Sequence, residues 1–197
     1  MRTPVLSLLF VVCCLPLSLA AAPPSDAELA RYAQGLLEQA HPDANTPGTA
    51  LLVARGDKVL YRGARGAASL QLEVPLSPDH VFRIGSVTKQ FAAAAVLKLA
   101  EDGKLSLDDP LTKFVPGYPG GEKVNVRMLL NHTSGIRSYT DMPGVMEGPI
   151  QKTVTTAQLI DTFKNEKPDF AAGEGWRYNN SGYVLVGAVI EAASAMP

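Results

Sequence analysis

Cysteine is almost absent from this 197-residue chain, and what there is lies at one end. Cys13 and Cys14 fall within the apolar run from Val5 to Leu17, which follows a single basic residue, Arg2, and precedes small residues at position 18 and at positions 20–22. This pattern is typical of a secretory signal peptide, and we expect residues 1–20 to be removed. The remaining protein would contain no disulfide and no thiol ligand, so a hydrophobic core must stabilise it.

The chain also has no excess of either charge and no long apolar run. It carries 18 Lys and Arg against 19 Asp and Glu, a net charge of −1, which argues against a nucleic-acid-binding protein. Its 46% hydrophobic and 19% charged content argues against disorder. The N-terminal run is shorter than the roughly 20 residues that span a bilayer, so we expect no stable membrane anchor and an exported protein, periplasmic or secreted.

Metal-binding and phosphate-binding patterns are missing as well. The chain has 3 histidines, none in a His-Glu-x-x-His arrangement and none near a cysteine pair. The glycines between Gly117 and Gly121 lack the Lys-Ser/Thr sequence of a phosphate loop. We therefore expect neither a metal nor another cofactor.

The first half of the chain shows one helix followed by strands. Ser25 and Glu28 form a capping-box sequence, and the apolar spacing after it predicts a helix over 26–40. Residues 49–54 and 58–63 are expected to form a hairpin around a Gly-Asp turn, and 81–84 a further strand. These elements define a first part, residues 26–85.

Helices dominate the second part, residues 86–197. A helix over 86–102 is apolar on all sides and so is expected to be buried. Short helices are expected over 126–131 and, after a capping sequence at Thr155, to about residue 165, with a final helix over 181–195. Strands before Gly85 and helices after it predict an α+β fold with antiparallel strands.

Ser86 and Lys89 stand at the first turn of the apolar helix. Residues three apart share a helix face, so an alcohol and an amine meet there beside the positive end of the helix. These are the parts of an activated nucleophile. The alternative is that Ser86 only caps the helix.

Tyr178 and Asn180 precede the final helix, in a loop that contains Trp176. A phenol and a carboxamide at this place would supply a proton shuttle and a hydrogen-bonding group to a cleft. The alternative is that Tyr178 only packs its ring and Asn180 caps the helix.

A Ser/His/Asp triad built on Ser134 and His132 is a weaker possibility. Ser134 lacks the leading glycine of a Gly-x-Ser-x-Gly turn, and His132 is too close in sequence to act as the base of a triad. We expect His132 to be a buried, hydrogen-bonded residue that fixes the turn after the short helix.

Three segments in order carry a resemblance to a known family: 86–91 (Ser-Val-Thr-Lys-Gln-Phe), 129–136 (Leu-Leu-Asn-His-Thr-Ser-Gly-Ile) and 178–183 (Tyr-Asn-Asn-Ser-Gly-Tyr). They resemble the signatures of the serine β-lactamase and DD-peptidase superfamily, in the class C β-lactamase-related branch. The resemblance implies an antiparallel sheet flanked by helices, plus a helical subdomain. It also implies that Ser86 is the acylated nucleophile, that Lys89 and Tyr178 transfer its proton and that Asn180 holds the substrate.

The resemblance implies an exported serine hydrolase that forms an acyl-enzyme on a small-molecule or peptide substrate: β-lactams, D-amino-acid peptides or small esters. The sequence departs from the family pattern because it contains no Lys-Thr-Gly or His-Thr-Gly segment, and because it ends where relatives continue into further sheet strands. The alternatives are thus a non-catalytic penicillin-binding or sensor-like protein of the same fold, or an inactive fragment.

Overall fold

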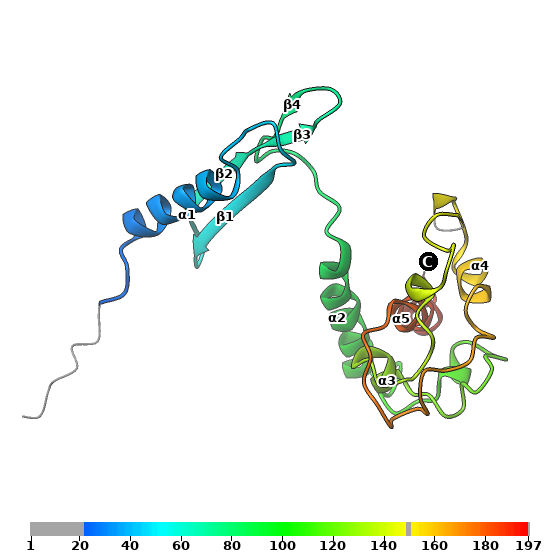
Figure 1. Ribbon diagram of the computed structural model, residues 1–197. Coiled ribbons are helices and arrows are strands. Elements are labelled where there is room, and N and C mark those ends of the chain that lie inside the picture. Colours follow the sequence, from blue (N-terminus) through cyan, green and yellow to red (C-terminus); the bar gives the residue numbers. More distant parts are fainter. Residues whose placement is uncertain (1–21, 149–150, 197) are drawn as a thin grey trace, which may run out of the picture. The chain divides into compact units, whose positions relative to one another are not determined.

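The computed structural model describes residues 22–148 and 151–196, which form two compact units (Figure 1). The first unit ends at Phe82 and the second begins at Arg83. The expected signal segment, residues 1–20, lies outside the described residues. Among the helices of the described part, none is long and apolar enough to cross a membrane.

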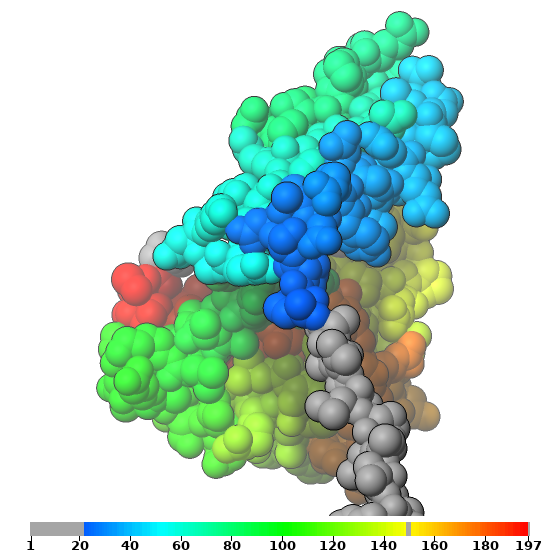
Figure 2. All heavy atoms as spheres, turned by 90° about the vertical axis from the view of Figure 1, so that its left-hand side faces the viewer, coloured from blue at the N-terminus to red at the C-terminus, as the bar shows by residue number. Residues whose placement is uncertain are grey.

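The first unit consists mainly of one helix against a hairpin. Helix α1 (Asp26–Ala40) lies along strands β1 (Thr49–Arg55) and β2 (Lys58–Arg65), and the atoms of helix and hairpin are in direct contact (blue and cyan in Figure 2). The expected capping box is present: the Ser25 hydroxyl accepts from the Glu28 amide, and the Glu28 carboxylate accepts from the Ser25 amide. The helix and hairpin predictions for this unit are confirmed.

The other strands of the first unit differ from the prediction. Residues 81–84 form no strand, and Val81 is 99% exposed, because this short run finds no partner strand. Instead β3 (Ala67–Ser69) pairs with β4 (Val74–Pro75), both too short to produce a period-2 pattern in the sequence. The described residues therefore hold two small two-stranded antiparallel sheets in place of one sheet flanked by helices.

The second unit is helical. It contains α2 (Thr88–Glu101), α3 (Val126–Leu130), α4 (Thr156–Asp161) and α5 (Asn180–Ser194), with 3₁₀ turns η1 (Gly85–Val87), η2 (Leu111–Lys113) and η3 (Tyr139–Asp141). Helix α5 contacts α2, α3 and α4. The core gathers around it, and its fully buried members include Val96, Leu111, Val126, Leu129, Phe163, Leu185, Val186 and Val189.

Helix α2 is less buried than its sequence suggests. Val96 and Leu99 are buried, whereas Phe91 is 63% and Leu97 54% exposed. The expectation of a helix buried on all sides is wrong because α2 packs on α5 through one face only. The helix ends at Glu101, one residue before the predicted end at 102, and Gly103 follows with a φ of 70°, a backbone conformation that suits glycine.

Candidate active site

Ser86 lies in the 3₁₀ turn η1, just before α2 begins. The N-cap of α2 is Val87, which makes no side-chain cap, so the interpretation of Ser86 as a helix cap is wrong. The Ser86 Oγ instead accepts hydrogen bonds from the Tyr178 hydroxyl, at 2.6 Å, and from the Lys89 Nζ, at 3.4 Å. A serine hydroxyl is therefore in contact with both an amine and a phenol.

Lys89 connects Ser86 with the residues at the start of α5. Its Nζ donates to the Asn180 Oδ1 at 2.7 Å and lies 4.7 Å from the centre of the Tyr178 ring and 5.2 Å from that of Tyr183. A cation over an aromatic face is attracted by the ring's electron density. The structure thus brings together all four residues singled out in the sequence, Ser86, Lys89, Tyr178 and Asn180, across about ninety positions of chain.

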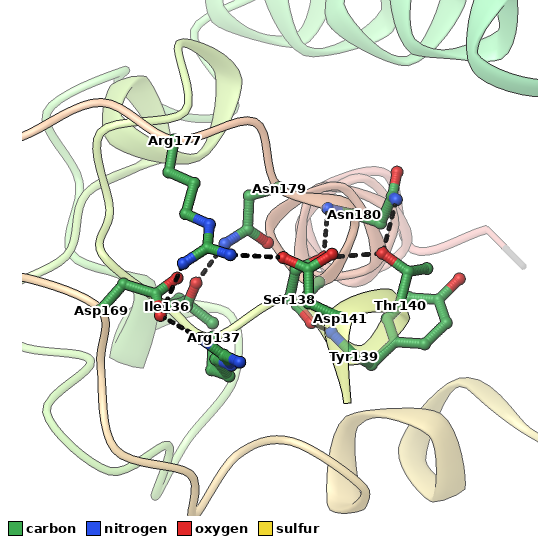
Figure 3. A network of polar contacts seen from close by, with 11 residues as sticks. Ile136, Arg137, Ser138, Tyr139, Thr140, Asp141, Asp169, Arg177, Asn179 and Asn180 are labelled. Atoms are coloured by element: carbon green, nitrogen blue, oxygen red, sulfur yellow. Dashed lines mark hydrogen bonds and ion pairs between the residues drawn. The ribbon is translucent and has the colours of Figure 1, made fainter. Parts of the chain in front are cut away.

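The cap of α5 is Asn179, not Asn180. The Asn179 side chain is buried, accepts from the Gly182 amide at 2.7 Å and donates to the Ile136 carbonyl. The interpretation of Asn180 as the cap is therefore wrong, and its carboxamide is available to the site. Its side-chain Nδ2 donates to the Thr140 Oγ1 at 3.0 Å (Figure 3). This contact orients the carboxamide, whose Oδ1 accepts from Lys89.

Two further residues of the site, Ser138 and Thr140, carry hydroxyl groups and were not predicted from the sequence. Ser138 Oγ accepts from the backbone N–H of Asn180 at 3.2 Å and lies 3.0 Å from the Thr140 Oγ1. The backbone amide of Tyr139 in turn donates to the Ser181 Oγ at 2.8 Å. These contacts join segments about forty residues apart, and no local pattern in the sequence signals them.

His132 packs beneath the site. Its φ is 65°, its Nδ1 accepts from the Asn179 amide at 3.1 Å, and its ring centre lies 4.7 Å from that of Tyr178. The prediction that it is hydrogen-bonded and holds the turn after α3 is confirmed, although the side chain is half-buried. The alternative triad does not form: Ser134 is buried, and its Oγ accepts from the Ile136 amide.

The electrostatics of the site lower the pKa of the Tyr178 phenol. The pKa of Tyr178 is lowered from its usual value, first by the Lys89 ammonium as a hydrogen-bond donor and then by the Ser86 hydroxyl. The pKa of His132 is also lowered, by burial and by the positive charge of Lys89, so its ring is neutral near pH 7. A neutral His132 with an accepting Nδ1 is the tautomer that the Asn179 contact requires.

A cavity of about 320 Å³ adjoins these groups, and its wall includes Tyr139 and Tyr183. A larger cavity of about 520 Å³ is lined by residues between Tyr118 and Ala172 and includes none of the four site residues. The smaller cavity is thus the one beside the chemistry. In the described part of the chain, no three His, Cys, Asp or Glu side chains are grouped so that they could hold a metal ion.

A serine hydroxyl in contact with a phenol and an amine at the start of a helix has the groups that nucleophilic catalysis by serine requires. The sequence profile of the Beta-lactamase family matches residues 29–197, and the chain belongs to this family. The resemblance seen in the three sequence segments is thereby confirmed.

Relatives in this family have several activities. The chain is 34% identical over 148 residues to Penicillin-binding protein 4* of Bacillus subtilis (strain 168), covering 74% of this chain and 32% of that protein. It is 34% identical over 185 residues to Esterase EstB of Burkholderia gladioli, covering 87% and 47%. The crystal structure of a D-stereospecific amidohydrolase from Streptomyces sp. matches with a TM-score of 0.71 and 35% identity, covering 85% of this chain and 50% of that one. The chain therefore spans half or less of the length of these relatives.

Proposed function

We propose that the protein is a serine hydrolase that forms an acyl-enzyme on Ser86. The observation that carries the proposal is the 2.6 Å hydrogen bond between the hydroxyls of Ser86 and Tyr178, with Lys89 3.4 Å from the same serine oxygen. When the phenol is neutral, it donates to Ser86; once ionised, it accepts the serine proton. The lowered pKa of Tyr178 makes the ionised form accessible.

Acylation would proceed in two steps, formation and collapse of a tetrahedral intermediate. The Ser86 proton moves to the Tyr178 oxygen while the Oγ forms a bond to the substrate carbonyl carbon. The tetrahedral oxyanion then collapses, the bond to the leaving oxygen or nitrogen breaks, and Tyr178 returns the proton to that leaving atom. The N-terminal end of α2, beside Ser86, stabilises the negative charge that develops on the carbonyl oxygen.

Deacylation repeats the same proton path with water. Tyr178 takes a proton from a water molecule while the water oxygen attacks the ester carbonyl carbon. Tyr178 then gives this proton to the Ser86 oxygen as the ester bond breaks and the carboxylic acid leaves. Asn180 would hold the amide or acyl oxygen of the substrate. Its position supports this role, since its amide lies at the wall of the cavity and is fixed by Thr140 and Lys89.

The names of the relatives guide the choice of substrate. An esterase, a penicillin-binding protein and a D-stereospecific amidohydrolase all act on or bind carbonyl compounds that a serine can attack. We propose the same range for this protein: small esters, D-amino-acid amides or peptides, and β-lactams. We further propose that it acts after export, on the basis of residues 1–20.

Covalent labelling tests the proposal directly. The full chain is incubated with a fluorophosphonate or a fluorescent penicillin, and intact-mass and peptide analysis locate the adduct. We expect one adduct per chain, on Ser86, and none in Ser86→Ala. Ser194→Ala, which removes a hydroxyl at the far end of α5, is the matched control and should be labelled at the parental rate. Equal labelling of Ser86→Ala and the parent would refute the proposal.

The same experiment separates a hydrolase from a non-catalytic binding protein. A β-lactam adduct that is lost while hydrolysed product accumulates indicates turnover. An adduct that persists with no product supports the penicillin-binding or sensor-like alternative.

A further inference from the structure

A group of four charged side chains lies beside the site and is used by none of the steps above. Asp169 Oδ1 accepts from Arg137 Nη1 at 2.6 Å and lies 3.3 Å from Arg177 Nη1, and Arg177 Nη2 donates to Asp141 Oδ2 at 3.0 Å (Figure 3). The Asp169 side chain is only 10% exposed, against 46% for Arg177. We refer to these four residues, Arg137, Asp141, Asp169 and Arg177, as the ion cluster.

The ion cluster connects two of the segments that form the site, the loop before α5 and the turn η3. Arg177 directly precedes Tyr178, and its backbone amide donates to the His132 carbonyl at 3.1 Å. Asp141 ends η3, the turn in which Thr140 holds the carboxamide of Asn180. The Arg177–Asp141 ion pair therefore ties the loop that carries Tyr178 to the turn that holds Asn180.

The loop that carries Tyr178 belongs to no helix or strand and is held by single contacts, among them the hydrogen bonds that the backbone amides of Arg177 and Asn179 donate to His132. Residues 168–179 form neither helix nor strand, so hydrogen-bond ladders do not set the place of the Tyr178 backbone. The phenol oxygen lies at the far end of a long side chain, where a small rotation at the backbone becomes a larger displacement. A 2.6 Å hydrogen bond to Ser86 does not survive a displacement of about 1 Å with its geometry intact.

We propose that Arg177, held between Asp141 and Asp169, is a positioning residue that sets the phenol of Tyr178 against Ser86 and Lys89. This inference rests on the proposed function for its catalytic meaning. Arg177 acts through the backbone and not through its charge, since the groups that lower the pKa of Tyr178 are Lys89 and Ser86. His132 and Tyr183 are the other titratable groups near the phenol.

The test compares Arg177→Met with variants that isolate each part of the cluster. Arg177→Met keeps the aliphatic stem and leaves Asp169 paired with Arg137, so the buried carboxylate is not left alone and the unit is expected to fold. Arg177→Lys keeps the charge but reaches one carboxylate at most, so it should rescue in part. Arg127→Met, which breaks the exposed pair with Asp108 in the same unit, is the matched control.

Two measurements are made on each full-length variant. One is the second-order rate of Ser86 labelling by a fluorophosphonate. The other is the titration of Tyr178, followed by tyrosinate absorbance as the difference from the same protein with Tyr178→Phe. Thermal unfolding confirms that each variant is folded.

We expect labelling of Arg177→Met to fall by roughly 10- to 100-fold, with Arg177→Lys between it and the parent and Arg127→Met unchanged. The Tyr178 titration should move to higher pH in Arg177→Met, because the phenol leaves the Lys89 ammonium. Asp141→Asn added to Arg177→Met should cause little further loss, since the two residues act through one contact.

A Tyr178 titration that stays at the parental pH in folded Arg177→Met overturns the inference, whatever the labelling rate. If the parent itself is not labelled on Ser86, the proposed function fails. The titration still decides the positioning role in that case, because it needs no turnover. The two failures are therefore distinguishable.

Discussion

Replacing Asn179 by alanine should destabilise the helical unit more than the loss of an ordinary helix cap. The side chain is 3% exposed, accepts from the Gly182 amide at 2.7 Å and donates to the Ile136 carbonyl. Loss of the cap costs about 1 kcal/mol. The buried carbonyl of Ile136 loses its donor in addition, which costs about 1–3 kcal/mol. We expect the free energy of unfolding to fall by about 2–4 kcal/mol.

Urea unfolding followed by circular dichroism measures this change in free energy. Two further variants separate the contribution of the helix cap from that of the Ile136 contact. Asn179→Ser keeps a cap acceptor without adding charge but is too short to donate to the Ile136 carbonyl as well, so it should recover only the cap contribution. Asn125→Ala removes a cap of the same chemistry, on α3, where the side chain accepts from the Met128 amide at 2.9 Å and donates to no buried carbonyl of the described residues. We expect about 1 kcal/mol there. Equal losses for Asn179→Ala and Asn125→Ala would refute the reasoning that the Ile136 contact matters.

Three further predictions follow from the same structure. The rate of Ser86 acylation should rise with pH as Tyr178 loses its proton, and the midpoint of the rise should lie below the usual phenol pKa of 10. Lys89→Met removes the main cause of the lowered pKa, so the midpoint should move to higher pH. A midpoint that is unchanged in Lys89→Met would contradict the assignment of Tyr178 as the titrating group. Leu185→Ala, at a fully buried position of α5, should lower the free energy of unfolding by about 2–5 kcal/mol. Leu97→Ala, at a 54% exposed position of α2, should lower it by about 0.5 kcal/mol or less. Similar losses for the two variants would show that the core is misassigned. Gly135→Ala should lower the unfolding temperature, because the φ of Gly135 is 72° and the new Cβ would lie 2.0 Å from the Phe170 carbonyl oxygen. Gly187→Ala in α5 has free space for a Cβ and should raise the unfolding temperature slightly. An unchanged unfolding temperature in Gly135→Ala would argue against this backbone conformation.

Elements whose signals are local could be predicted from the sequence. Helix α1 begins at its capping box, the hairpin turns at Gly56, and α5 covers its apolar segment to within a residue. Helix α4 begins after Thr155 as predicted, with both capping-box contacts, but ends at Asp161 rather than near residue 165. Capping residues fix where a helix starts, whereas the end of α4 depends on tertiary contacts such as the burial of Phe163.

Features that depend on distant partners could not be predicted in this way. The short strands β3 and β4 exist only because they pair with each other, and the exposed face of α2 depends on which neighbours it has. In the site, helix geometry alone placed Ser86 near Lys89, but the approach of Tyr178 was implied by the family resemblance and not by spacing. Ser138 and Thr140 were missed for the same reason, since their contacts with Asn180 cross about forty residues.

The arrangement of two helix starts explains how an ammonium and an ionisable phenol coexist in the site. Helices α2 and α5 pack together, with Ser86 just before the first and Tyr178 just before the second. Both N-terminal ends carry partial positive charge, which favours a phenolate and a carbonyl oxyanion but disfavours a cation. Lys89 is held there because the Asn180 oxygen and the face of the Tyr178 ring both supply negative potential. Because Asn179 rather than Asn180 caps α5, the Asn180 oxygen is available, and Lys89 has this second acceptor besides the Ser86 Oγ.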